Sequence, residues 1–271
     1  MLRNIGCLLL LGAVPIEAGL IGYVDFGGTF FYLDYPHNLS NTPGHPTASE
    51  TGPNAINDLG AIVGFNYGLQ SGFLFNGAAY TTIMDPNAQN GTFPSGINNG
   101  GVVVGNYTQN VGQLGLTFGF FYSAGIYTTL NYPGTSGATW ARGINNSGAI
   151  VGSYLDSSGA EHGFLYSGGG NFTTIDEPNA YATFPNGIND NGEVVGAYSV
   201  GNFGNAGVYG FLYSTGNFTP ITDPVGTPGQ FVANGINNNG VIVGYEDVTP
   251  PAPPIPEPAC GYLIVGGLVG I

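Results

Sequence analysis

Short runs of hydrophobic and polar residues alternate along most of this chain, and one run returns five times. Its clearest copy, at 187–198, reads Gly-Ile-Asn-Asp-Asn-Gly-Glu-Val-Val-Gly-Ala-Tyr. A repeat period of 40 to 50 residues is typical of solenoids and propellers, in which each repeat forms one structural unit. An Ile-Asn pair marks the copies, which begin 41 to 48 residues apart, at Ile56, Ile97, Ile144, Ile188 and Ile236.

Each copy contains four segments with the composition of β-strands. In the third and fourth copies these segments are clearest at 183–189, 149–154, 163–166 and 172–178. They are rich in β-branched and aromatic residues, Gly, Pro and Asn bound them, and no helical period appears between the termini. An Asn- and Gly-containing turn between the first two segments is typical of a hairpin.

The count of segments predicts an all-β, five-bladed β-propeller of four-stranded blades. The N-terminal stretch 22–36 matches segments three and four, whereas the C-terminal stretch 231–246 supplies segments one and two. We therefore expect N-terminal strands to pair with C-terminal strands and close the ring. A linear β-solenoid is the alternative. Proline in the first segment indicates an edge strand, which we place innermost, beside the axis, at Pro53, Pro94 and Pro185.

Composition narrows the range of possible functions. Only 7% of the residues are charged, and the 16 acidic residues outnumber the two arginines, Arg3 and Arg142, which gives a formal net charge of −14. Nucleic-acid binding is excluded because it requires Lys and Arg to neutralise phosphates, and an anionic membrane surface is disfavoured for the same reason. The two cysteines, Cys7 and Cys260, lie outside the repeats, so the repeats contain no disulfide.

The N-terminal segment 1–18 has the layout of a secretory signal peptide. It carries one positive charge, an apolar run at 7–14 and a cleavage signal ending at Ala18. Signal peptidase is therefore an expected partner. The alternative is a buried N-terminal strand or helix.

The C-terminal end consists of a Pro-rich linker at 249–258 and an apolar segment at 259–271, too short to span a bilayer, which needs about 20 residues. Pro256, Glu257 and Pro258 before an apolar segment resemble the PEP-CTERM sorting signal of Gram-negative bacteria. That resemblance implies processing by exosortase, only transient membrane contact, and delivery to the cell surface or extracellular matrix. The family's basic tail is missing here, so the signal is truncated or degenerate. An incidental Pro-rich tail is the alternative.

The repeat wording Gly-Ile-Asn-x-x-Gly-x-Ile-Val-Gly, together with His-Gly-Phe-Leu-Tyr at 162–166, resembles the HAF-type extracellular repeat family. The resemblance covers 22–246. It implies an extracellular location and a repeat architecture, and it transfers no catalytic residue. The expected domains are thus a signal peptide at 1–18, a propeller at 19–248, and the two C-terminal segments.

Residues for nucleophilic or metal chemistry do not form a recognisable set. The three histidines, His37, His45 and His162, accompany no nucleophile motif, and zinc-ligand spacing is absent. The acidic stretch 156–161 offers oxygens for calcium but reads more simply as an exposed turn. We predict no cofactor and no metal.

Paired carboxylates are the remaining catalytic hypothesis, because some five-bladed propellers are glycosidases. Four acids end the fourth segment of their copies, where the fifth copy has Asn131, and they follow the repeat instead of breaking it. A catalytic pair requires two different environments, so turn capping is favoured for these acids and for the repeated asparagines. The acids are Asp34, Asp85, Asp176 and Asp223; the asparagines are Asn57, Asn98, Asn145, Asn189 and Asn237.

Trp140 and Arg142 do break the symmetry of the repeat. Trp140 is the only tryptophan, and Arg142 is the only Lys or Arg after the expected signal peptide. Residues two apart share a strand face, and an aromatic ring beside a guanidinium suits a sugar ring or a carboxylate. Alternatively, Trp140 fills the core and Arg142 pairs with a neighbouring acid.

The sequence therefore predicts a secreted, surface- or matrix-associated, non-catalytic propeller that binds extracellular polysaccharide or serves as a structural module. A glycan-cleaving enzyme on the same fold, either a glycoside hydrolase or a lyase, is the alternative.

Overall fold

The computed structural model describes residues 4–8, 21–26, 29–33, 51–112, 114–135, 138–201, 207–221 and 231–246, and every regular element in these ranges is a β-strand. The Pro-rich linker and the apolar segment predicted at the C-terminus lie outside these ranges, as do Pro256, Glu257 and Pro258. The described residues contain no helix long and apolar enough to cross a membrane.

Three complete blades form the regular part of the molecule. In each, four strands consecutive in sequence pair antiparallel, as expected of hairpins joined by short turns. Blade 2 contains β8 (Thr92–Ile97), β9 (Val103–Val111), β10 (Leu114–Ser123) and β11 (Ile126–Leu130). Blade 3 contains β12 (Thr139–Ile144), β13 (Ile150–Leu155), β14 (Glu161–Tyr166) and β15 (Phe172–Thr174). Blade 4 contains β16 (Ala182–Ile188), β17 (Val194–Val200), β18 (Gly207–Ser214) and β19 (Asn217–Ile221).

Blade 1 has the same four-strand pattern within a larger, seven-stranded sheet. Its strands are β4 (Thr51–Ile56), β5 (Ile62–Asn66), β6 (Ser71–Phe75) and β7 (Tyr80–Ile83). The additional strands are β1 (Asn4–Leu8), β2 (Ile21–Phe26) and β3 (Thr29–Leu33). At the other end of the chain, β20 (Phe231–Ile236) and β21 (Ile242–Glu246) form a two-stranded sheet, which we call the half-blade.

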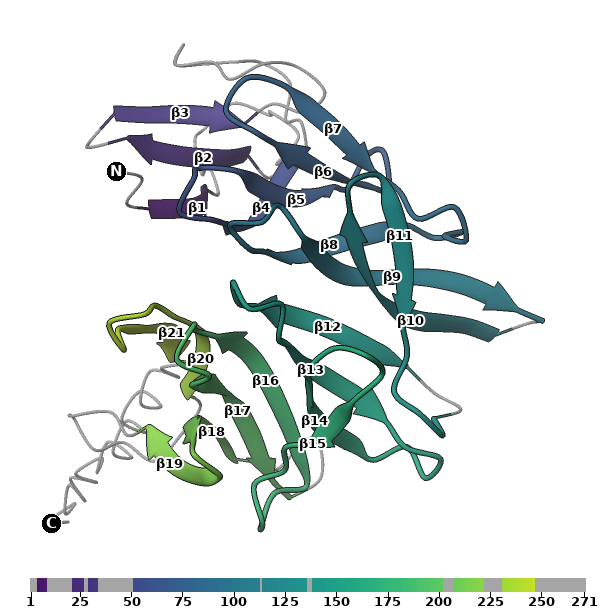
Figure 1. Cartoon of the computed structure of the whole chain (residues 1–271), viewed down its shortest axis with the longest axis vertical. Helices are drawn as coiled ribbons and strands as arrows, with labels where there is room; N and C mark the ends of the chain where they lie inside the picture. The colour runs from purple at the N-terminus through teal and green to yellow at the C-terminus, as the bar shows by residue number, and fades with distance from the viewer. Residues whose placement is uncertain are drawn as a thin grey trace, which may run out of the picture.

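The sheets follow one another around a common axis, in a propeller-type arrangement (Figure 1). The first strand of each sheet contacts the first strand of the next, from β4 through β8, β12 and β16 to β20. The innermost position expected for the proline-bearing strand is therefore confirmed. The expected pairing of the two chain ends is not seen in the described strands, because β2 pairs with β1, β3 and β4, whereas β20 and β21 pair only with each other. The first and last described strands, β1 and β21, both lie on the left of Figure 1.

Proline on the innermost strand coincides with a β-bulge. Register shifts separate Pro53 from Ala55, Pro94 from Gly96 and Pro185 from Gly187, and the other two first strands shift at the same point. A bulge on an edge strand interrupts the ladder, so a residue without an N–H is tolerated there.

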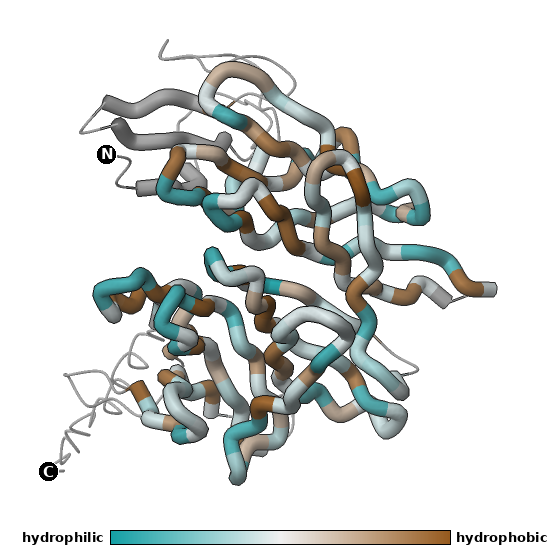
Figure 2. Tube along the Cα trace, in the orientation of Figure 1, coloured by the Kyte–Doolittle hydropathy of each residue, from teal (hydrophilic) through white to brown (hydrophobic). Residues whose placement is uncertain are grey.

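Hydrophobic clusters lie between successive blades, and Figure 2 shows hydrophobic segments within the strands and hydrophilic ones at many turns. Between blades 1 and 2, Val63 and Ile83 of the first pack against Ile97, Val103 and Phe120 of the second. The phenylalanine of every third strand is fully buried, at Phe73, Phe120, Phe164 and Phe211.

A glycine of the second strand permits this packing in each blade. Gly105 lies opposite Phe120, and a Cβ at Gly105 would meet the carbonyl oxygen of Phe93 and come within 2.9 Å of the Phe120 ring. The Val-Gly of the repeat therefore marks a close approach of backbone and ring, which a larger residue would block. The same contact occurs at Gly64, Gly152 and Gly196.

Candidate binding site on the axis

The asparagine after each repeat isoleucine links neighbouring blades. The Oδ1 of Asn98 accepts the N–H of Val102 at 3.0 Å within its own turn, while its Nδ2 donates to the carbonyl oxygen of Asn145 at 3.1 Å. Asn57, Asn145 and Asn189 make the equivalent bond to the next blade at 2.9, 3.0 and 3.1 Å. These side chains are buried and their bonds are structural, which agrees with their interpretation as turn residues.

A second ladder runs alongside the first on the exposed side of the turns. The backbone N–H of Asp58 donates to the Oδ1 of Asn99 at 3.0 Å, and Asn146 donates in the same way to Asp190 at 2.8 Å. Asp190 also accepts from the Nδ2 of Asn238 at 2.8 Å. Hydrogen bonds from the backbone and then the side chain of Asn146 hold the pKa of Asp190 below its usual value. The two ladders surround a depression of about 230 Å³ at the mouth of the axis.

Behind this mouth lies an axial cavity of about 650 Å³, to which all five first strands contribute. The residue in the bulge of each first strand faces it. Two of these residues bond the next blade, because the Nδ2 of Asn54 donates to the Pro94 carbonyl at 2.7 Å and that of Asn186 to the Ala233 carbonyl at 3.0 Å. The five bulge residues are Asn54, Ser95, Arg142, Asn186 and Asn234.

Arg142 is the one cationic Lys or Arg among the described residues. Its Nη2 donates to the Oγ of Ser153 at 3.2 Å and lies 3.6 Å from the Oε1 of Glu161. Ser153 in turn donates to Glu161 at 2.6 Å. Desolvation lowers the pKa of Arg142, and the nearby Glu161 carboxylate opposes that shift. The expected alternative of an arginine paired to an acid is therefore realised.

The pairing leaves part of Arg142 available. Its side chain is 36% exposed, whereas that of Glu161 is 14% exposed. Its Nε is buried and makes no hydrogen bond to a described residue. A ligand oxygen would therefore meet the exposed part of the guanidinium and not the buried Nε.

Trp140 and Arg142 both lie on β12, with Arg142 in the bulge between Ala141 and Gly143. Trp140 is half-buried opposite Ser153 and is not among the described residues that line the axial cavity. Reasoning from spacing alone missed the bulge, and it also missed Ser153 and Glu161, whose contact with Arg142 depends on the pairing of β12, β13 and β14.

Two of the candidate acids lie among the described residues. Asp85 is buried, and its Oδ1 accepts the N–H of Asn87 at 2.8 Å, which agrees with a role in a turn. Asp176 instead accepts the N–H of Gly163 on β14 at 3.0 Å, so its contact joins two segments of blade 3 and does not cap a turn. Asp34 and Asp223 lie outside the described residues, as do His37 and His45.

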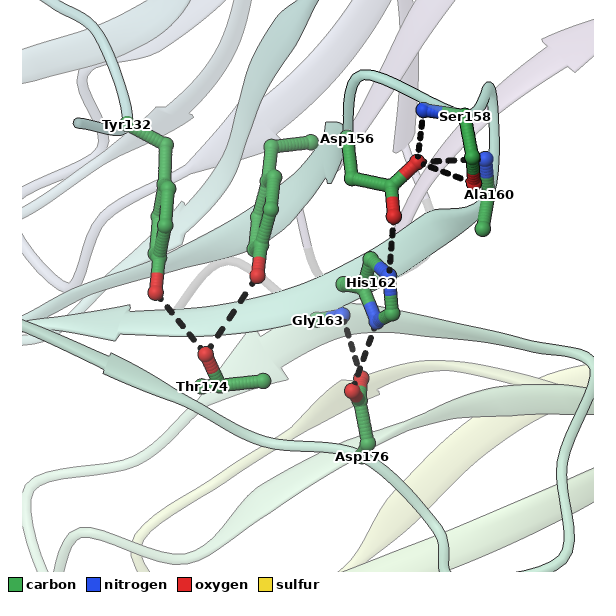
Figure 3. A network of polar contacts seen from close by, with 9 residues as sticks. Tyr132, Asp156, Ser158, Ala160, His162, Gly163, Thr174 and Asp176 are labelled. Carbon is green, nitrogen blue, oxygen red and sulfur yellow. Dashed lines mark hydrogen bonds and ion pairs between the residues drawn. The ribbon is translucent and has the colours of Figure 1, made fainter. Parts of the chain in front are cut away.

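His162 bridges two carboxylates on the outer part of blade 3 (Figure 3). Its Nδ1 lies 2.7 Å from the Oδ2 of Asp176, and its Nε2 lies 3.4 Å from that of Asp156. Desolvation lowers the pKa of His162, but the carboxylates of Asp176 and then Asp156 outweigh it, so the pKa is raised above 6.5. Beside this group, the stacked rings of Tyr132 and Tyr154 both direct their hydroxyls at Thr174.

The acidic stretch 156–161 forms a tight turn. The Oδ1 of Asp156 accepts from the backbone and hydroxyl of Ser158 and from the N–H of Ala160, and these bonds, Ser158 first, lower the pKa of Asp156 to about 2. This agrees with the turn interpretation. Among the described residues, no three His, Cys, Asp or Glu side chains gather as they would around a metal ion.

Comparisons with known proteins give a fold likeness only. No family model matches the chain, and no curated protein matches it. A solved structure of streptogramin B lyase is 15% identical with a TM-score of 0.45, covering 90% of this chain and 87% of its own. A lectin of Aleuria aurantia in complex with Fucα1-6GlcNAc is 12% identical with a TM-score of 0.43, covering 84% of each chain. At these values neither likeness assigns a function to any residue of this chain.

Proposed function

We propose that this protein is a non-catalytic, propeller-type binding module that holds a segment of extracellular polysaccharide in its axial cavity. The observation that carries the proposal is the asymmetry of the cavity wall. Four bulge residues are neutral and polar, and the fifth is Arg142, a cation whose side chain is 36% exposed.

The cavity offers what a carbohydrate requires. Its volume of about 650 Å³ lies within the usual range of ligand sites, roughly 300 to 1,000 Å³. Amide and hydroxyl groups of Asn54, Ser95, Asn186 and Asn234 line it beside the guanidinium. Sugar hydroxyls both donate and accept hydrogen bonds, so they suit such a wall, and a sugar carboxylate suits Arg142.

Glycan cleavage on the same fold would require two carboxylates across the axis, roughly 5 to 10 Å apart. The described acids nearest the axis are Asp58 and Asp190, at the mouth, and both accept hydrogen bonds from asparagine side chains. The described lining of the larger cavity contains no carboxylate. These observations favour binding over cleavage.

A binding experiment with a matched variant tests the proposal. The purified 19–247 chain is titrated with a panel of polysaccharides, including the matrix of the producing organism, and each supernatant is assayed for new reducing ends. Arg142→Asn places at this position the residue that blades 1 and 4 carry there, so the fold should persist. We expect saturable binding without reducing ends, and an affinity about tenfold lower in the variant. Unchanged affinity in Arg142→Asn would remove Arg142 from the site, and released reducing ends would favour the enzyme.

The proposed location is the cell surface or matrix of a Gram-negative bacterium, after the action of signal peptidase and exosortase. Its support is the sequence at 1–18 and at Pro256, Glu257 and Pro258. Fractionation of cells that express the chain with and without residues 249–271 tests it. Equal distribution of both forms would leave the C-terminal signal without a role.

The proposed architecture is a closed ring of five blades, in which β20, β21, β2 and β3 form the fifth. Its support is the repetition of the clusters between blades. In each of three clusters, the second strand of one blade contributes a valine, and an Ile or Leu comes from the end of its fourth strand or the residue just after it, as Val104 and Leu130 do. A fourth cluster lies on the side of blade 1 that faces away from blade 2. It contains Leu33 of β3, at the position of the fourth-strand Ile or Leu in the other clusters, and Leu33 is 0% exposed.

The missing valine of that cluster is Val243. At the equivalent position of blades 1 to 4 the valine is 0% exposed, whereas Val243 is 62% exposed. Closing the ring would place it beside Leu33 and Ile62, where the repeat requires a valine. The apolar area that this removes from water favours closure.

A further inference from the structure

The first strand of the chain has the pairing of a blade's second strand. In blades 1 to 4, the second-strand glycine lies opposite the third-strand phenylalanine, as Gly64 does with Phe73 and Gly152 with Phe164. In β1, Gly6 lies opposite Tyr23 of β2. The pairing of β2 with β3 also repeats the third and fourth strands of a blade, because Gly22 lies opposite Leu33 as Gly72 lies opposite Ile83.

The position of β1 relative to blade 1 is also that of a second strand relative to the following blade. The second strand of each blade contacts the first strand of the following blade, as β5 contacts β8 and β13 contacts β16. In the same way, β1 contacts β4. The strands β1, β2 and β3 therefore stand as strands two, three and four of a blade that precedes blade 1.

That second-strand place is the one β21 would take in a closed ring. The sequence of β21, Ile-Val-Gly-Tyr-Glu, has its glycine at the third position, as β1, Asn-Ile-Gly-Cys-Leu, does. In the repeat register, Gly244 would lie opposite Tyr23 and Val243 opposite Val24. Ile5 now holds the position opposite Val24. Hence β1 and β21 compete for a single edge of β2.

We propose that β1 is a placeholder strand: the leader keeps the ring open by occupying the edge of β2, and its removal lets β21 close the ring. This inference rests on the closed ring proposed above. The physical basis is effective concentration. While the chain is intact, the short stretch 9–20 tethers β1 directly to β2, and closing such a loop costs little entropy. Cleavage after Ala18 makes β1 a separate, diluted peptide, whereas β21 stays tethered through the blades.

A disulfide competition separates the two states. Antiparallel partners lie about 4.5 to 5.5 Å apart at Cα, within disulfide reach. The full chain carries V24C, I5C and V243C in a C7S, C260S background, with a specific protease site inserted after Ala18. Disulfides form under exchange conditions before and after cleavage, and peptide mass spectrometry identifies them. We expect position 24 to link to position 5 in the intact chain, and to position 243 after cleavage.

Two further chains make the outcomes distinct. A chain beginning at Gly19 with V24C and V243C tests ring closure alone. If the chain beginning at Gly19 forms no disulfide, or only a disulfide between two copies, both the closed ring and the placeholder are overturned. If that chain forms an intramolecular disulfide, and the intact full chain also links position 24 to position 243, the placeholder alone is overturned. In the intact chain with V24C and V243C, I5P removes a backbone N–H from β1 and should permit the 24-to-243 link without cleavage. If I5P does not permit this link, the result also counts against the placeholder.

Discussion

At the scale of single residues, the polar side chains beside the axis act by joining segments far apart in the sequence. The amide of Asn98 serves its own turn with one atom and the next blade with the other. Arg142 takes the position of a neutral amide and bonds Ser153 and Glu161 instead of the next blade. The repeated asparagines therefore bond neighbouring blades to each other, whereas Arg142 places a positive charge in the cavity.

Asn98→Ala should lower the free energy of unfolding by about 2 kcal/mol, because the N–H of Val102 loses its acceptor and the carbonyl of Asn145 loses its donor from the neighbouring blade. Chemical denaturation of the purified 19–247 chain measures this. Asn239→Ala is the matched control, since Asn239 is exposed in an equivalent turn. Equal effects in the two variants would contradict an inter-blade role.

The contribution of His162 to stability should depend on pH. Its pKa is raised in the folded chain by Asp176 and Asp156, so its charged form stabilises the fold fully below the unfolded value of 6.5. This contribution is lost as pH rises through the folded pKa. The difference in unfolding free energy between the parent and His162→Gln should therefore shrink between about pH 6 and about pH 9. A constant difference across that range would show that the ring acts without its charge.

At the scale of elements, each blade is incomplete by itself. The second strand places a valine against the next blade, and a glycine beside it allows the backbone to approach the buried phenylalanine of the third strand. The half-blade repeats both features at Val243 and Gly244 without the neighbour that would cover them. An unpaired strand edge of this kind needs a partner strand.

Val243→Ala in the 19–247 chain should cost about 2 kcal/mol if the ring closes, because closure buries the removed methyl groups. Val241→Ala is the control, since blade 4 carries the charged Glu193 at the equivalent position. Thermal and denaturant unfolding compare the two. Equal, near-zero effects would indicate that Val243 stays in water.

At the scale of the whole molecule, the chain is a succession of similar sheets around an axis, and acidic residues greatly outnumber basic ones. Its formal net charge is −14, and two arginines oppose 16 acids. Mutual repulsion of surface carboxylates destabilises a compact state, and salt screens it. Packing and the asparagine ladders hold the blades together against this repulsion.

Added sodium chloride should therefore raise the thermal unfolding midpoint at neutral pH. Near the sequence pI of about 4.1 the net charge disappears, and the same addition should change the midpoint much less. Differential scanning calorimetry at both pH values makes the comparison. A midpoint that falls with salt at neutral pH would mean that attractive ion pairs dominate.

The sequence alone determined the local structure of this protein. Segment length, composition and the Asn-Gly turns specified four strands in each repeat, and Pro94 and its counterparts placed the first strand at an edge, because such features act within a few residues of one another. The turn roles of Asn98 and Asp156 followed from the same short-range bonding.

Only the tertiary structure decided which residues meet across the repeats. The strand β12 bulges between Ala141 and Gly143, and strand pairing brings Glu161 to the guanidinium of Arg142; spacing along the chain reveals neither. The place of β1 likewise depends on a register between segments that no local pattern links. Contacts of this kind are set by packing and pairing in three dimensions, where a shift of one residue changes the face of every side chain.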